Sequence, residues 1–129
     1  MHGVVYELAG LPCLLASRDG AQAGVLAYHV SGDGLEIVTL EALERRRGVG
    51  TALVSAACEL ASSLGLQRVW LVTTNDNLDA LRFYQRRGFR LVGLAPDAVA
   101  AARSVKPSIP FVGDYGIPIL DELTLELSL

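Results

Sequence analysis

The feature that most constrains this chain is a basic, glycine-containing segment between a strand pattern and a helix pattern. Residues 35–40 (LEIVTL) have strand composition, residues 45–50 read Arg-Arg-Arg-Gly-Val-Gly, and apolar residues then recur at helical spacing as far as Ala61. Glycine at 48 and 50 leaves the backbone accessible to a ligand. The start of the following helix carries unpaired N–H groups and a partial positive charge. This arrangement favours a phosphate or pyrophosphate guest.

Two common phosphate-binding motifs do not fit the segment. No Lys-Ser or Lys-Thr pair follows the glycines, as the P-loop requires, and Leu53 occupies the third glycine position of the dinucleotide fingerprint. A short Gly-x-Gly also occurs in ordinary tight turns. The segment by itself therefore leaves an anion site and a simple strand-to-helix turn as alternatives.

Three strands are expected before the segment. Apolar runs at Leu11–Ser17 and Gly24–Val30, each ended by turn residues, predict a β-hairpin with a loop of about four residues. The third strand, 35–40, should place Glu36, Val38 and Leu40 on one face and Ile37 and Thr39 on the other.

After the segment, the pattern predicts a helix over 50–64 that ends at Gly65 and a mostly apolar central strand over 68–73. Asn75-Asp76-Asn77 supplies N-cap chemistry for a second helix, Gly88 ends it, and 89–92 begins another strand. Residues 96–118 are mixed, with a helical turn or two at 98–104 and then an ordered loop. Residues 123–127 alternate as a final strand.

Composition places the chain among small soluble globular domains. Its 129 residues are the length of one domain (1–129), and 51% hydrophobic content excludes a disordered chain. The net charge of −3 argues against a nucleic-acid partner, although eight of the eleven basic residues lie between Arg45 and Arg90.

Cysteine usage and hydropathy indicate a cytoplasmic location. Cys13 and Cys58 match no metal or redox spacing, no secretion signal is evident, and no apolar run approaches the ~20 residues that cross a bilayer. We therefore expect no membrane association and no structural metal. The mean hydropathy of +0.38 is consistent with a homodimer in which a second copy covers part of the surface.

A second motif follows the central strand. Asn77-x-x-Ala80-x-x-x-Tyr84-x-x-x-Gly88-Phe89 comes after Trp70-Leu71-Val72. Together, the two motifs resemble the GNAT superfamily of N-acetyltransferases, which use acetyl-CoA, over residues 35–89. The resemblance implies a mixed α/β (α+β) fold. Its mostly antiparallel sheet would have flanking helices and a splayed central parallel pair formed by 35–40 and 68–73. The helices that usually lie between the first two strands would be shortened or absent.

The resemblance also implies roles for individual residues. The backbone of Leu40 would pair with the pantetheine arm, and its neighbourhood would polarise the thioester carbonyl. Asn77 would contact the cofactor, and Tyr84 would contact it and protonate the departing sulfur. The pyrophosphate would be held by Arg45, Arg46, Arg47, Gly48, Val49, Gly50 and Thr51.

The general base is less constrained. A protonated amine must lose a proton before it attacks, commonly to a carboxylate. Glu36 is our candidate, although an ordinary solvated or ion-paired strand residue fits as well. Glu41 and Glu44 lie nearer the arginines, and His29 on the neighbouring strand is an alternative base or a structural histidine. Asp121 and Glu122 either line an amine site or simply begin the last strand.

The expected function is transfer of an acetyl group from acetyl-CoA to a primary amine, on a small molecule or a peptide, by direct attack in a ternary complex. An acidic C-terminal region would suit a cationic acceptor. Two alternatives remain: a non-catalytic acyl-CoA sensor or structural module of the same fold, and a phosphate-binding regulatory domain that prefers ATP.

Overall fold

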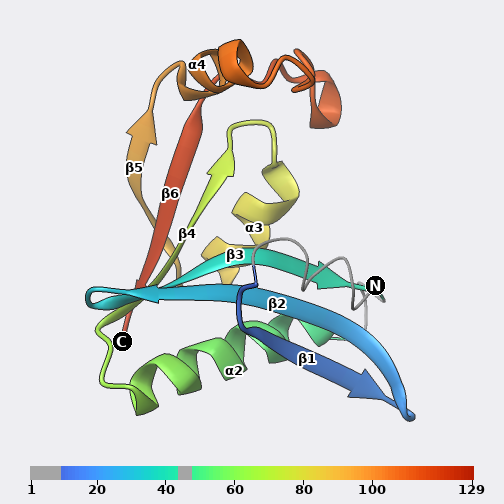
Figure 1. Ribbon diagram of the computed structural model, residues 1–129, viewed down its shortest axis with the longest axis vertical. Helices are drawn as coiled ribbons and strands as arrows, with labels where there is room; N and C mark the ends of the chain where they lie inside the picture. The colour runs from blue at the N-terminus through green and yellow to red at the C-terminus, as the bar shows by residue number, and fades with distance from the viewer. Residues whose placement is uncertain (1–9, 44–47) are drawn as a thin grey trace. The chain divides into compact units, whose positions relative to one another are not determined.

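The computed structural model describes residues 10–43 and 48–129 (Figure 1). The strands are β1 (Cys13–Arg18), β2 (Ala21–Ser31), β3 (Gly34–Ala42), β4 (Arg68–Thr74), β5 (Arg90–Ala95) and β6 (Glu122–Ser128). The helices are α2 (Val49–Ser63), α3 (Leu78–Arg86), α4 (Ala98–Val105) and the 3-10 turn η2 (Asp114–Gly116).

The sheet order is β1-β2-β3-β4-β6-β5. Neighbours β1–β2, β2–β3 and β5–β6 are antiparallel, whereas β3 and β4 are parallel. The predicted fold class, a mixed and mostly antiparallel sheet with a central parallel pair and flanking helices, is confirmed. The expectation about the N-terminal helices concerns residues 1–9, which lie outside the described residues.

The chain divides into two compact units, Met1–Trp70 with Ser128–Leu129, and Leu71–Leu127. In the first unit, α2 packs on β1, β2 and β3 (Figure 1). The apolar spacing of α2 buries one stripe of the helix against the strands, as periodicity predicts. The buried side chains of the helix are Val49, Leu53, Val54, Ala57 and Ala61, and those of the strands include Leu26, Leu35, Ile37 and Val69.

The first hairpin is tighter than predicted. Arg18 pairs with Ala21, so its connection has two residues instead of about four. Ser31 pairs with Gly34, so the connection between β2 and β3 also has two residues. Asp19 and Gly20 both have positive φ (52° and 80°), the geometry of a type I′ turn that matches strand twist. The turn residues were identified correctly, but the strands continue further toward them.

The second unit contains α3, β5, α4, η2 and β6. Its interior includes Tyr84, Phe89, Val99, Ile119 and Leu125. Gly88 ends α3 with φ 94°, as predicted, and the short helix expected near residues 98–104 is α4.

Side-chain hydrogen bonds order the segment after α4. The guanidinium of Arg103 donates to the carbonyl oxygens of Ile109, Pro110 and Ile119. The amide of Asn75 donates to the carbonyl of Pro118 and accepts from two backbone N–H groups beyond it. The expectation of an ordered loop in this segment is therefore confirmed. No described helix has the length and apolar character needed to cross a membrane.

Candidate active site

Helix α2 begins at a glycine in a conformation that few other residues adopt. Gly48 has φ 72° and ψ 12°, in the left-handed region, and its carbonyl accepts the N–H of Ala52 at 2.9 Å. Gly48 supplies no side-chain cap to the helix, and N–H groups at the start of a helix point along its axis toward any ligand bound there. A Cβ built on Gly48 would meet nothing within 4 Å. The backbone here is open to a ligand.

Gly24 brings the start of this helix against the sheet, and sequence reasoning did not assign it a role. A Cβ on Gly24 would lie 2.6 Å from Val49 Cγ1, 2.8 Å from the Glu41 carbonyl oxygen and 3.1 Å from Leu53 Cδ1. The missed signal was an isolated glycine inside an apolar strand run, which indicates close backbone approach. Gly24 therefore sets where the N-terminus of α2 lies relative to β3.

Substitution of Gly24 tests this positioning role. We expect Gly24→Val to lower the free energy of unfolding by about 1–3 kcal/mol, because extra methyl groups must displace Val49 and Leu53. The measurement is urea unfolding of the variant beside wild type. Gly32→Val is the comparison variant. It adds the same side chain in the turn between β2 and β3, where no atom lies within 4 Å of the Cβ position, and its φ of 57° adds backbone strain of its own. An unchanged Gly24→Val protein would show that the contact yields without cost.

Strand β3 contains a bulge near its centre. Ala27 pairs with Thr39 and Tyr28 pairs with Ile37, so Val38 is an extra residue on β3 without a partner on β2. A bulge bends its strand, increases the local twist and releases backbone groups from the ladder. The bulge lies just before Leu40, in the stretch expected to meet the acyl end of the cofactor.

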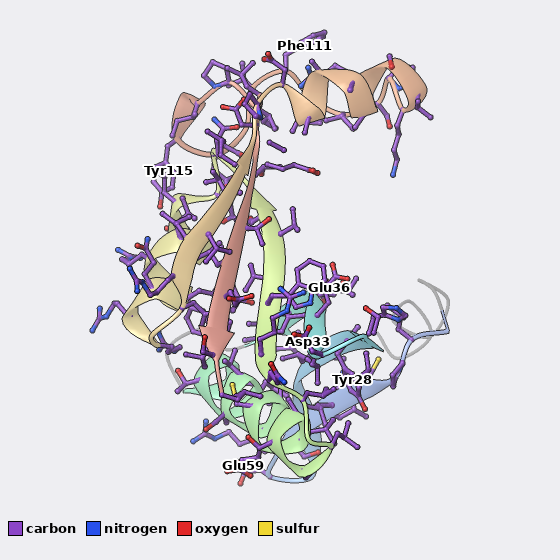
Figure 2. The ribbon with its side chains drawn as sticks, turned by 90° about the vertical axis from the view of Figure 1, so that its left-hand side faces the viewer. Tyr28, Asp33, Glu36, Glu59, Phe111 and Tyr115 are labelled. Carbon is purple, nitrogen blue, oxygen red and sulfur yellow. The ribbon has the colours of Figure 1, made fainter. Side chains whose placement is uncertain are left out.

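The bulge changes which side chains share a face. Directly paired residues of an antiparallel ladder point to the same side, so the register places Glu36 with His29 and Thr39 with Ala27 on one face. Tyr28, Ile37 and Leu40 lie on the opposite face, the one packed on α2. We name these the far face and the helix face; Figure 2 shows Glu36 and Tyr28 on opposite sides of the strands.

The prediction that Glu36 and Leu40 share a face was therefore wrong, as was the grouping of Ile37 with Thr39. Strict alternation holds only in a strand without an extra residue, and one insertion moves every later side chain to the other side. The sequence carries no glycine or proline at 37–39 to signal the insertion. The role assigned to Leu40 uses its backbone and does not depend on this face.

The parallel pairing of β3 with β4 covers the start of both strands. It runs from Gly34 with Arg68 to Glu36 with Trp70, and β3 then continues to Ala42. The registered ladder ends one residue before Ile37, next to the bulge. Trp70 thus lies beside Glu36 on the far face, because paired residues in a parallel ladder also share a face.

Asn77 is the N-cap of α3. Its carbonyl oxygen accepts the N–H of Ala80 at 3.2 Å, and its amide nitrogen donates to Thr73 Oγ1 at 3.1 Å. The predicted capping role is confirmed. The contact with a cofactor that the resemblance implies stays a prediction.

Tyr84 is buried in the second unit, with 6% of its surface exposed. Its ring makes edge-to-face contacts with Phe83 and Phe89, at centroid distances of 5.1 and 5.2 Å. Burial raises the pKa of Tyr84 to about 12, because the phenolate is the form that desolvation penalises. The side chain therefore keeps its proton at neutral pH and is available as a donor.

The remaining candidates fall into two groups. Arg45, Arg46, Arg47 and Glu44 lie outside the described residues. Asp121 precedes β6, and its carboxylate accepts the N–H of Asp97 at 2.9 Å, which supports the structural alternative for this residue. Within residues 10–43 and 48–129, no group of His, Cys, Asp and Glu side chains is arranged to hold a metal.

Three comparisons relate this arrangement to known proteins. The chain is 43% identical over 119 residues to the uncharacterized protein YxbD of Bacillus subtilis, covering 92% of this chain and 74% of that protein. It is 35% identical over 81 residues to a streptothricin acetyltransferase of Streptomyces lavendulae, covering 59% of this chain and 42% of that protein. A Bacillus subtilis acetyltransferase solved in complex with CoA superposes with a TM-score of 0.80 at 27% identity, covering 98% of this chain and 83% of that one.

The family assignment follows from the first part of the chain. The acetyltransferase (GNAT) family matches residues 4–89, the stretch that carries β1 to β4 and all of α2 and α3. An acyltransferase activity, predicted from the two motifs, is confirmed at the level of the family. This chain belongs to the GNAT family of acetyltransferases.

Proposed function

We propose that this protein transfers an acetyl group from acetyl-CoA to a primary amine by direct attack of the amine on the thioester. The observation that carries the proposal is the start of α2. Helix α2 begins after a left-handed glycine whose Cβ position is open, and it follows the bulged strand β3 within the stretch that matches the GNAT family. The solved relative with CoA bound supports the same donor.

The residues present fit the donor. The N–H groups of Val49, Gly50 and Thr51 would hold the pyrophosphate, because the start of a helix carries a partial positive charge that favours an anion. The backbone of β3 around Leu40 would pair with the pantetheine arm. When bound, acetyl-CoA supplies an acyl group activated as a thioester. The protein's contribution is then largely to position the two reactants.

Two side chains are assigned to proton transfer. Glu36, half-buried on the far face, would take the proton of the incoming ammonium group. Tyr84 would donate to the leaving sulfur. With a pKa of about 12, its phenol is a weaker acid than a thiol of ordinary pKa near 8.5, so it acts first as a hydrogen-bond donor to the developing charge. Full transfer requires the sulfur to be desolvated as well.

Removal of the phenol hydroxyl tests the role of Tyr84. We expect Tyr84→Phe to lower kcat by about 10- to 100-fold and to leave the affinity for acetyl-CoA nearly unchanged, because the ring contacts remain and only the donor is lost. Steady-state kinetics with separate determination of kcat and KM measures this. A variant with wild-type kcat would remove Tyr84 from the mechanism.

The acceptor we propose is a cationic amine. Glu36 places a carboxylate on the far face, where it would attract a cationic amine. The positive charge of Arg68 is already paired with Asp33, whose Oδ1 lies 3.1 Å from Arg68 Nε. A relative is named a streptothricin acetyltransferase, so streptothricin belongs in the test panel with spermidine, kanamycin and a peptide with a free N-terminus. Equal rates across cationic and neutral amines would contradict the preference for a cation.

The first experiment is thermal unfolding with saturating acetyl-CoA, with ATP as the control. A ligand at about 100 times its Kd stabilises by roughly 2.7 kcal/mol, which is a shift of several degrees. Release of CoA is then followed with a thiol-reactive dye across the amine panel. Stabilisation by acetyl-CoA without turnover would favour the non-catalytic sensor, and stabilisation by ATP alone would favour the regulatory domain.

A further inference from the structure

His29 lies directly across the ladder from Glu36. The two residues are a register pair of β2 and β3, so their Cβ atoms are separated by about 4.5–5.5 Å and their side chains share the far face. His29 is exposed and Glu36 is half-buried. Among the described residues, neither side chain has a hydrogen-bond or ion-pair partner. The pair therefore consists of one carboxylate and one imidazole with unused proton-accepting atoms.

Two charged residues near the start of β3, Arg68 and Asp33, interact with each other. Arg68 Nε donates to Asp33 Oδ1 at 3.1 Å, and the guanidinium lies 5.2 Å from the centre of the Trp70 ring. Gly34 makes room for this stack, since a Cβ there would lie 3.0 Å from Trp70 Cδ1. The arginine is thereby bound at the β3 start, two register pairs away from Glu36.

The β3 bulge explains why the two groups end on this side. Glu36 and His29 precede the extra residue Val38, whereas the residues after it continue toward the helix start at Gly48. Without the bulge, Glu36 would share its side with Leu40 and would face α2. The proton-accepting pair is thus separated from the helix face, which is filled by apolar side chains such as Leu35 and Ile37.

We propose that His29 is the second proton acceptor of the reaction and relays the proton taken by Glu36 to solvent. This rests on the proposed acetyl transfer. The ammonium group gives one proton to the Glu36 carboxylate, and the amine nitrogen then forms a bond to the acyl carbon as the carbon–sulfur bond breaks. The carboxyl group passes its proton through an intervening water molecule to the imidazole, which releases it to solvent. The second proton lost by the nitrogen ends on the thiolate sulfur, so each turnover yields amide, CoA thiol and one proton.

The physical reason for a relay is the difference in exposure. A half-buried carboxylate can accept a proton from substrate, but bound substrate blocks its direct return to water. An imidazole is a base that can exchange a proton with water, and the exposed position of His29 gives it access to solvent. His29 is in this view a proton-relay residue that acts through Glu36.

Chemical rescue tests the proposal. His29→Ala should lower kcat by about tenfold or more, leave the acetyl-CoA thermal shift unchanged and regain activity as imidazole is added. 1,2,4-Triazole, a ring of the same size and far lower basicity, should not restore it. His29→Gln, which fills the space without a basic group, should be slow and insensitive to imidazole. Ser31→Ala, on the same strand and face, should match wild type throughout.

The outcomes separate the inference from the proposed function. The assay uses the fastest amine of the panel, with blanks for the uncatalysed reaction of imidazole. Wild-type rates in His29→Ala would overturn the relay, and so would a slow variant that imidazole fails to rescue or that triazole rescues equally. If wild-type protein releases no CoA with any amine of the panel, acetyl transfer itself fails before His29 is examined.

Discussion

Gly48→Glu is expected to abolish stabilisation by acetyl-CoA. The new carboxylate would lie at the start of α2, where the pyrophosphate is proposed to bind. At an effective dielectric constant near 20, two like charges about 4 Å apart repel by about 4 kcal/mol, which corresponds to roughly a 10³-fold loss of affinity. The thermal shift produced by saturating acetyl-CoA should then fall within error of zero.

The control for this prediction is Gly48→Ala. Gly48 has φ 72°, so any side chain there costs about 1–2 kcal/mol in backbone strain. Alanine adds this strain without charge, into space where no atom lies within 4 Å. We expect Gly48→Ala to melt earlier and still to be stabilised by acetyl-CoA. Full stabilisation of Gly48→Glu by acetyl-CoA would place the pyrophosphate elsewhere.

The second large effect is expected for Glu36→Gln. Glutamine keeps the size of the side chain but cannot take a proton at neutral pH, so kcat/KM should fall by about 10²- to 10⁴-fold, the usual contribution of a positioned general base. The acetyl-CoA thermal shift should not change, since the amide occupies the same place on the far face. Both quantities are measured with the amine that reacts fastest in the panel.

Glu41→Gln is the matched control for Glu36→Gln. Glu41 lies on the same strand and the same face as Glu36, opposite Val25 of β2, and it is exposed. It carries the same change in charge at a distance from the proposed acceptor. Equal losses in the two variants would indicate a general electrostatic effect of the far face, and an active Glu36→Gln protein would eliminate Glu36 as the base.

Much of the fold could be predicted because its signals are local. Helical spacing from Val49 to Ala61 identified α2, Asn77 identified the start of α3, and the turn residues at 19–20 identified the first hairpin. Each depends on the conformational preference of a few adjacent residues. The pattern of two motifs also identified the acetyltransferase family, which the match over residues 4–89 confirms.

The candidate site was predicted only in part because two of its features arise between strands. The face of Glu36 depends on the register of β3 against β2, and the extra residue Val38 has no mark in its own sequence neighbourhood. The role of Gly24 depends on the approach of Val49 and Leu53, which are distant along the chain. Strand pairing partners and the distance between a strand and a helix are properties of the packed chain.

The sequence by itself determined the order of elements, the glycine start of α2 and the family, because each follows from residue type at fixed spacing. The tertiary structure alone decided that His29 and Glu36 lie opposite each other on the far face and that Leu40 lies on the other face. The physical reason is the bulge: one unpaired residue in a ladder reverses the side of every residue after it, and only the paired strand reveals where that residue lies.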